Sequence, residues 1–135
     1  MESGKMKVSC GACAVVVVLL GDALVVANTG DSEALLSRGG RAVELCFLHK
    51  ASNPQEIRRV REAGARILAQ GSMYRVEGQL AVTRSIGLLY FKRQFQHAVI
   101  PDPHVRVVKL CQEDEFVVLG SDGLFDVFPK RRDLC

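Results

Sequence analysis

The sequence lacks an apolar run long enough to cross a bilayer, and it lacks a secretory signal. Its longest apolar stretch, residues 12–27, is interrupted by Gly21 and Asp22. Each half is far shorter than the roughly 20 residues that a membrane helix needs. Residues 1–5 are polar and charged, which does not fit the start of a signal peptide. We therefore expect a protein with no membrane partner.

The sequence also lacks a strong excess of charge. Its formal net charge is +3, with 24% charged and 48% hydrophobic residues over 135 positions. This composition is that of one globular domain with a hydrophobic core, and it excludes an intrinsically disordered chain. The charge is too small to indicate nucleic acid as a partner. The one basic cluster, Lys130, Arg131 and Arg132, is interpreted as a solvated tail.

Metal-binding patterns of Cys and His are absent as well. The five cysteines are an odd and scattered set, and the Cys10–Cys13 pair has no second pair at zinc-site spacing. The three histidines, His49, His97 and His104, lie on separate segments without zinc-ligand spacing. Unpaired thiols fit a reducing compartment, so we expect an intracellular protein, cytoplasmic or nuclear.

What the sequence does contain is a succession of short strands. Residues 14–20 are uniformly apolar and β-branched, which predicts a strand buried on both faces. Gly21 and Asp22 predict a hairpin turn, and Gly39 and Gly40 predict another. Strands are expected at residues 14–20, 23–27, 33–38 and 41–46. Their short connections favour an antiparallel meander.

One helix has clear boundary signals. Ser52 or Asn53 can cap it, Pro54 suits its first turn, Glu56 can complete a capping box with Asn53, and Gly64 can end it. Residues 85–96 are ambiguous, and a helix is expected to start at residues 124–128. Further strands are expected at residues 66–69, 74–76, 80–83, 105–110 and 115–119. The fold class is therefore α+β, built on antiparallel sheets.

The candidate site consists of three aspartates at strand ends. Asp122 and Asp126 follow the apolar strand at residues 116–119, and Asp31 follows the strand at residues 23–27. Each alone can be a turn former, because Asp hydrogen-bonds nearby backbone. Together, at strand ends that a sheet can bring close, they indicate hard oxygen ligands for Mg²⁺ or Mn²⁺.

Five blocks, in order, resemble the metal-dependent protein phosphatases of the PPM (PP2C) family. The segment at residues 24–34 resembles L-x-V-A-N-x-G-D-S-R-A, and residues 75–87 resemble R-V-x-G-x-L-A-V-S-R-A-x-G. Residues 116–127 resemble F-x-I-L-A-S-D-G-L-W-D-V. The other two blocks are residues 11–14, similar to G-S/T-x-A, and residues 49–64, similar to D-H-K-P followed by an E-x-x-R-I-x-x-x-G helix.

This resemblance implies an antiparallel β-sandwich flanked by helices, with a binuclear Mg²⁺ or Mn²⁺ site at one edge. It implies that Asp122 is a core metal ligand and that Asp31 and Asp126 bind a further, weaker metal. The implied activity is hydrolysis of phosphoserine and phosphothreonine in phosphorylated protein substrates by a metal-activated water. No protein nucleophile is then needed, so neither Ser32, Ser121 nor any cysteine is a candidate.

Departures from the family pattern set the expectations for this chain. No segment resembles the family's D-G-H-G-G or G-x-x-D-N ligand blocks, nor its phosphate-binding Arg. Leu48 and Leu88 replace aspartates, and Glu33 replaces an arginine. We therefore expect residues 1–135 to be a partial phosphatase domain that binds metal weakly and hydrolyses little. The alternative is a non-catalytic, phosphatase-like module that acts through protein–protein interaction.

Two further side chains have alternative interpretations. Arg84 could clamp phosphate, but its position after a buried strand favours a structural ion pair. His49 and Lys50 could orient loops near the metal site, although a purely structural role is favoured.

Overall fold

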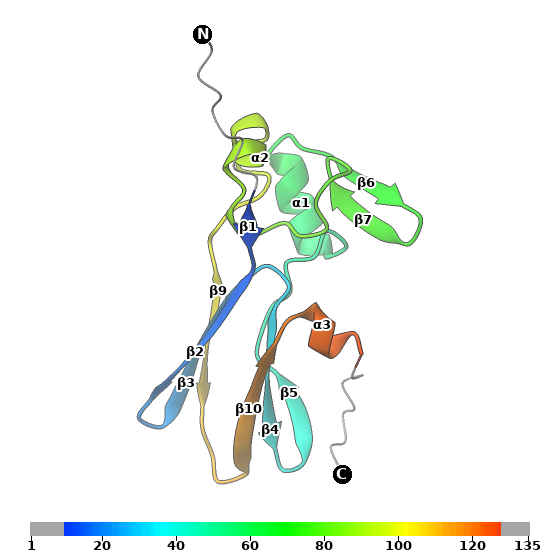
Figure 1. Ribbon diagram of the computed structural model, residues 1–135. Helices are drawn as coiled ribbons and strands as arrows, with labels where there is room; N and C mark the ends of the chain where they lie inside the picture. Colours follow the sequence, from blue (N-terminus) through cyan, green and yellow to red (C-terminus); the bar gives the residue numbers. More distant parts are fainter. Residues whose placement is uncertain (1–9, 128–135) are drawn as a thin grey trace.

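A computed structural model describes residues 10–127 of the chain. Its lower half, as drawn in Figure 1, consists of two three-stranded antiparallel sheets. The first has the order β2-β3-β9, with bounds Ala14–Leu20, Ala23–Thr29 and His104–Lys109. The second has the order β10-β4-β5, with bounds Asp114–Gly120, Glu33–Arg38 and Arg41–Glu44. The predicted antiparallel sandwich is confirmed.

The predicted four-stranded meander is wrong, because the chain changes sheet at the turn after β3. β3 pairs with β2 and β9, whereas β4 pairs with β10 and β5. Both hairpins were correctly predicted, since their turns are local. Gly21 has φ +58°, and Gly39 and Gly40 have φ +55° and +72°, conformations that glycine adopts without steric cost. The pairing between hairpins is not local, and the turn sequence does not encode it.

The inward faces of the two sheets share one hydrophobic core. Alternate residues of β3 and β4 point into it, as the two-residue period of a strand requires. Its buried members are Leu24, Val26, Ala34, Leu36, Leu45 and Val108. Val15 and Val17 of β2 are partly buried against this cluster.

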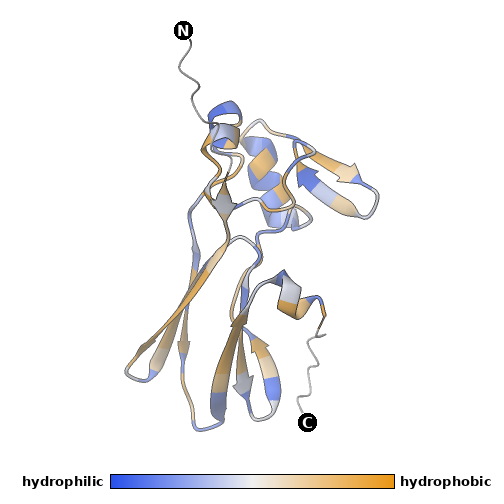
Figure 2. Cartoon of the chain, viewed as in Figure 1, coloured by the Kyte–Doolittle hydropathy of each residue, from blue (hydrophilic) through white to orange (hydrophobic). Residues whose placement is uncertain are grey.

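The opposite face of β2 is open, which contradicts the prediction of a strand buried on both faces. Val16 and Val18 are 53% and 43% exposed, and Leu19 and Leu20 at the strand end are also exposed. An unbroken apolar run shows that both faces tolerate burial, but it does not show which layer covers each face. Within residues 10–127 the outer face of β2 stays exposed. Figure 2 shows that this strand is apolar along most of its length.

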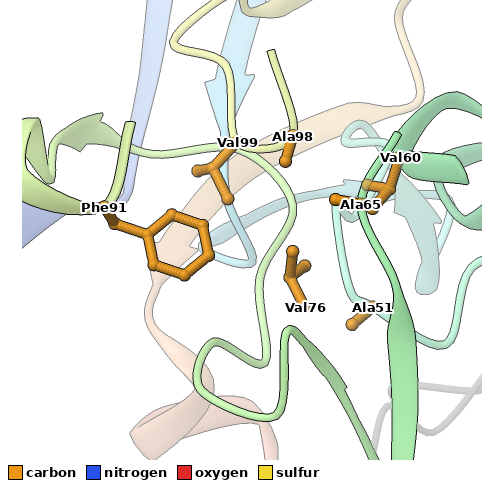
Figure 3. Close-up of a cluster of buried hydrophobic side chains, with 7 residues drawn as sticks. All are labelled: Ala51, Val60, Ala65, Val76, Phe91, Ala98 and Val99. Carbon is orange, nitrogen blue, oxygen red and sulfur yellow. The ribbon is translucent and has the colours of Figure 1, made fainter. Parts of the chain in front are cut away.

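The upper half holds the main helix and a small second core. α1 (Pro54–Glu62) lies beside the hairpin of β6 (Ile67–Gln70) and β7 (Met73–Val76), and α2 (Leu89–Gln94) lies at the top of the view in Figure 1. β1 (Gly11–Ala12) pairs with β8 (Ile86–Gly87). The buried side chains, drawn in Figure 3, are Ala51, Val60, Ala65, Val76, Phe91, Ala98 and Val99.

The ends of α1 follow the sequence signals, except at Glu56. The Asn53 side chain accepts a hydrogen bond from Gln55 N at 3.0 Å, Pro54 opens the helix, and Gly64 has φ +80° just beyond it. The predicted capping box is wrong, because the Glu56 carboxylate is buried and binds Arg59, Thr83 and Arg84 instead. Thr83 and Arg84 lie 27 and 28 positions away, so the local spacing could not reveal them.

Several shorter expectations need revision. Residues 80–83 form isolated bridges rather than a strand. The ambiguous segment resolves into β8 and α2. The last helix, α3 (Asp122–Phe125), begins two residues before the predicted start. Phe128, the end of that predicted helix, and the basic cluster at Lys130, Arg131 and Arg132 lie outside the described residues. Across residues 10–127 no helix is both long and apolar enough to span a membrane.

Candidate functional site

Asp31 lies in the turn that carries the chain from β3 to β4. The turn depends on Gly30, whose φ of +95° is open to glycine but strained for other residues. Two hydrogen bonds join His49 to this turn. Gly30 N donates to His49 Nδ1 at 3.2 Å, and His49 N donates to Gly30 O at 3.0 Å. Asp31 is half-buried and follows this anchored glycine directly.

Asp122 is brought beside Asp31 by the register of the second sheet. Gly120, the last residue of β10, is opposite Glu33, the first residue of β4. Asp122 begins α3 two residues after Gly120, and Asp31 precedes Glu33 by two. Both aspartates line one pocket of about 250 Å³. The prediction that Asp31 neighbours Asp122 in space is confirmed.

Asp126 lies one turn further along the chain. Its backbone N donates to Asp122 O at 2.8 Å, which places it just beyond the four residues of α3. Its side chain is exposed and is not among the residues that line the pocket of Asp31 and Asp122. The structure therefore brings two of the three predicted aspartates to one pocket, with the third beside it in sequence.

Cys13 is a neighbour of this pair that the sequence did not single out. Its Sγ donates a hydrogen bond to Asp31 Oδ1 at 3.2 Å. Burial raises the pKa of the Cys13 thiol, and the negative charges of Asp31 and Asp122 raise it further. Neutral thiol is therefore the form at this position near pH 7. The sequence indicated reduced thiols for Cys10 and Cys13, and none of the described cysteines forms a disulfide.

The rest of the pocket wall comes from two other elements. Lys50 and Ser52 precede α1, and Ser72, Met73 and Tyr74 come from the β6–β7 hairpin. The remaining wall residues are Ala51 and Ala81. Lys50 supplies positive charge to a pocket that holds two carboxylates, and the hydroxyls supply hydrogen-bonding groups. The pocket can therefore receive a polar ligand.

Glu56, in the first turn of α1, is the centre of a buried ionic network. Its carboxylate accepts hydrogen bonds from Arg84 at 2.8 Å, from Thr83 Oγ1 at 2.7 Å and from Arg59 at 3.0 Å. Burial by itself would raise the pKa of Glu56, but the hydrogen bonds from Arg84, Thr83 and Arg59 outweigh it and lower the pKa to about 2. Arg84 is thus a structural ion-pair residue, as the sequence favoured.

His49 connects the network to the Asp31 turn. Its backbone O accepts from Thr83 Oγ1 at 3.0 Å, while its ring faces Gly30. Burial lowers the pKa of His49 to about 4, and the positive charge of Arg84 acts in the same direction. The imidazole is therefore neutral near pH 7, and its contact with the turn is a hydrogen bond rather than an ion pair.

Three substituted positions have clear structural surroundings. Leu88 is the residue before α2, has φ +53°, makes no side-chain cap and packs against the core shown in Figure 3. Glu33 is 5% exposed at the start of β4, two residues from Asp31. Leu48 uses its backbone O to accept from Asn53 Nδ2 at 3.2 Å.

The number and type of the available ligand atoms determine which metal centre the described residues can form. Asp31 and Asp122 offer carboxylate oxygens to one pocket, which suits a hard divalent cation that keeps several waters. In the described part of the chain, no three or more Asp, Glu, His or Cys side chains gather closely enough to hold a metal ion. These residues fit one weakly held cation. They do not fit the binuclear centre that the resemblance implied.

Comparison with known proteins gives a consistent result. The family model described as "Protein phosphatase 2C" matches residues 1–133. A probable protein phosphatase 2C 8 of Oryza sativa subsp. japonica is 48% identical over 117 residues, covering 87% of this chain and 28% of the relative. Protein phosphatase 2C 37 of Arabidopsis thaliana is 44% identical over 119 residues, covering 88% and 29%. The chain therefore spans less than a third of the length of these relatives.

Solved structures agree with the fold. A C. elegans sex determining protein superposes with a TM-score of 0.81 at 29% identity, covering 90% of this chain and 29% of that one. A serine-threonine phosphatase 2C from Toxoplasma gondii gives a TM-score of 0.78 at 21% identity, covering 90% and 44%. The second likeness, at its low identity, bears on the fold alone.

Proposed function

The chain belongs to the protein phosphatase 2C family, whose members are metal-dependent enzymes, and on that premise we propose that it is part of a protein serine/threonine phosphatase domain. The proposed substrates are proteins phosphorylated on serine or threonine. The observation that carries the proposal is the shared pocket of Asp31 and Asp122, which come from different sheet connections. We also propose a reducing compartment, cytoplasmic or nuclear, and the described cysteines, which form no disulfide, support it.

The residues described have distinct roles in this proposal. Asp31 and Asp122 would hold one divalent cation, Mg²⁺ or Mn²⁺, with Asp126 contributing from the next turn of the chain. Such a cation supplies Lewis-acid polarisation of a water or a phosphoryl oxygen. Lys50 contributes positive charge at the pocket wall, and His49 keeps the Asp31 turn in place through Gly30. The chain by itself is proposed to bind metal weakly and to hydrolyse little, because the carboxylates near the pocket compensate the charge of only one cation.

The proposal is tested by titrating the purified chain with Mn²⁺ and Mg²⁺ in a calorimeter. We expect weak binding that Asp122→Asn abolishes, because the variant keeps the side-chain shape and removes the ligand charge. The matched control is Asp22→Asn, which changes an exposed aspartate in the β2–β3 turn. Equal affinity in Asp122→Asn and the native chain would refute the site.

A phosphatase assay on a phosphothreonine peptide accompanies the titration. Slow or undetectable release of phosphate is expected even at saturating Mn²⁺. Robust Mn²⁺-dependent release by the chain alone would contradict the proposed one-cation site.

The second candidate function is a non-catalytic, phosphatase-like module. The observation that favours it is Leu88, an apolar residue that packs into the core where the family pattern has an aspartate. A module of this kind needs no metal, so absence of any Mg²⁺ or Mn²⁺ binding in a folded chain would select it over the phosphatase.

A further inference from the structure

A buried polar cluster lies where the first sheet meets the segment after β5. Asn28 of β3 and His104 of β9 are directly opposite in the antiparallel ladder, so their side chains share a face about 5 Å apart at Cβ. Phe47 packs against both histidines, with ring centroids 5.4 Å from His49 and 5.5 Å from His104. Asn28 Nδ2 donates to Phe47 O at 2.7 Å. Asn28, Phe47, His49 and His104 therefore form one contiguous cluster, here named the Asn–His cluster.

Three atoms of the Asn–His cluster are buried without a hydrogen-bond partner among the described residues. They are Asn28 Oδ1, His49 Nε2 and His104 Nδ1. Asn28 and His49 are 1% and 0% exposed, so bulk solvent does not reach them. Leaving one such atom unpaired costs of the order of 1–3 kcal/mol, and native proteins rarely leave several together. A hydrogen-bonding ligand at the cluster would remove this cost.

The roles of the three atoms are set by the bonds that their side chains already make. The Asn28 amide nitrogen is committed to Phe47 O, so the unpaired atom is the acceptor oxygen. His49 Nδ1 lies 3.2 Å from Gly30 N and 3.1 Å from Gly30 O. Gly30 O already accepts from His49 N, whereas Gly30 N–H has no other acceptor among the described residues, so we assign the acceptor role to Nδ1. A neutral His49 with Nδ1 as acceptor carries its proton on Nε2, which must then donate.

The cluster thus presents one donor, His49 Nε2–H, and one certain acceptor, Asn28 Oδ1. His104 Nδ1 can serve as a second acceptor. A water molecule complements this set with two O–H donors and a lone pair, giving the three hydrogen bonds that buried waters typically make. We propose that an ordered internal water binds between Asn28, His49 and His104, accepting from His49 Nε2–H and donating to Asn28 Oδ1 and His104 Nδ1.

A transition metal is the competing ligand for two imidazoles, and the geometry disfavours it. A metal would need the Nε2 lone pair of His49, which requires the proton on Nδ1. That tautomer would leave Gly30 N–H without its acceptor. The water instead fixes the tautomer that holds Gly30, the residue before Asp31. The site is independent of phosphatase activity and stands whether or not the pocket binds a cation.

Nuclear magnetic resonance on the isotopically labelled chain tests the site directly. At pH 7 we expect both His49 and His104 as the Nε2–H tautomer. We also expect cross-relaxation between His49 Nε2–H and water, with the sign that a long-lived bound water molecule gives. His97, which is exposed, is the internal control and should show only exchange with bulk water.

Two results of that experiment would overturn the proposal. One is the Nδ1–H tautomer of His49, or an Nε2–H without a bound-water signal. The other is a joint shift of the His49 and His104 signals on adding Zn²⁺ alone, which would assign the site to a metal.

Substitution of His104 gives a second test, in which the direction of the change in stability decides the outcome. His104→Phe keeps a ring against Phe47 but removes the Nδ1 acceptor, so it should lower the folded-to-unfolded ratio about fivefold. His104→Asn keeps a polar atom at the Nδ1 position and should retain most of that stability. If the atom were unpaired in the native chain, His104→Phe would be the more stable variant, and the proposal would fail.

Discussion

At the scale of single residues, Gly30 shows how one backbone position controls the candidate site. Its φ is +95°, and a Cβ added there would lie 2.2 Å from Cys13 Sγ and 3.2 Å from Cys13 Cα. The second contact is with backbone, so rotating a side chain cannot relieve it. Because Cys13 donates to Asp31, a change at Gly30 displaces the candidate ligand as well as the fold.

We predict that Gly30→Ala lowers the free energy of unfolding by the order of 3 kcal/mol, the sum of backbone strain and overpacking. Urea unfolding followed by circular dichroism measures this. The matched control is Gly71→Ala, where φ is +62° and nothing lies within 4 Å of the added Cβ, so only the strain of about 1 kcal/mol is expected. Equal losses in the two variants would show that the contact with Cys13 is unimportant.

At the scale of elements, the outer face of the β2-β3-β9 sheet is apolar and uncovered within residues 10–127. Val16 and Val105 flank Ala27, and Val18 and Val107 flank Val25, so these side chains lie on one face. The four outer valines are between 43% and 66% exposed. A continuous apolar sheet face of this kind favours association.

We predict that the purified chain self-associates through this face, and that Val18→Thr with Val107→Thr shifts it toward monomer. Threonine keeps the β-branched shape that suits a strand while adding a hydroxyl to the exposed face. Sedimentation velocity over a range of concentrations measures the change. Leu68→Thr with Leu89→Thr, at two exposed apolar positions elsewhere, is the control and should leave association unaltered. A native chain that stays monomeric at high concentration would contradict this.

At the scale of the whole molecule, the sensitivity of folding to acid follows from two buried groups, His49 and Glu56. His49 has its pKa lowered from 6.5 to about 4 by burial, and it is faced by Arg84, Glu56 and His104. Glu56 has its pKa lowered from 4.5 to about 2 because its hydrogen bonds outweigh its burial. In both cases the unfolded chain binds a proton at a pH where the folded chain does not, so stability falls as the pH falls.

We predict a continuous loss of stability from about pH 6.5 to about pH 2, first through His49 and then through Glu56. Each group contributes a slope of at most about 1.4 kcal/mol per pH unit within its own window. Urea unfolding at a series of pH values measures the slope. Glu56→Gln should reduce the slope below about pH 4.5, where Glu77 and Asp114, whose pKa values are lowered by Arg66 and Arg38, keep their own contributions. A stability that is flat between pH 6.5 and 4 would rule out the buried neutral His49.

The candidate site was predictable as far as each aspartate could be placed at the end of a strand. Asp31 and Asp122 follow apolar strands, and their meeting depends on the pairing of β4 with β10, which are distant in sequence. Cys13 was not predicted as their neighbour, because its contact with Asp31 joins residues 18 positions apart. The Glu56 network was missed for the same reason, since a glutamate in the first turn of a helix has an ordinary local role as a cap.

The sequence by itself determined what neighbouring residues decide: the strands, the glycine turns, and the cap and end of α1. It also indicated the family, because five segments that resemble the family pattern occur in the same order along the chain. Only the tertiary structure decided that β3 and β4 belong to different sheets, that the outer face of β2 is open, and that Cys13, Asp31 and Asp122 meet. Turn and strand preferences act over a few residues, whereas sheet pairing and burial depend on contacts between segments that folding alone brings together.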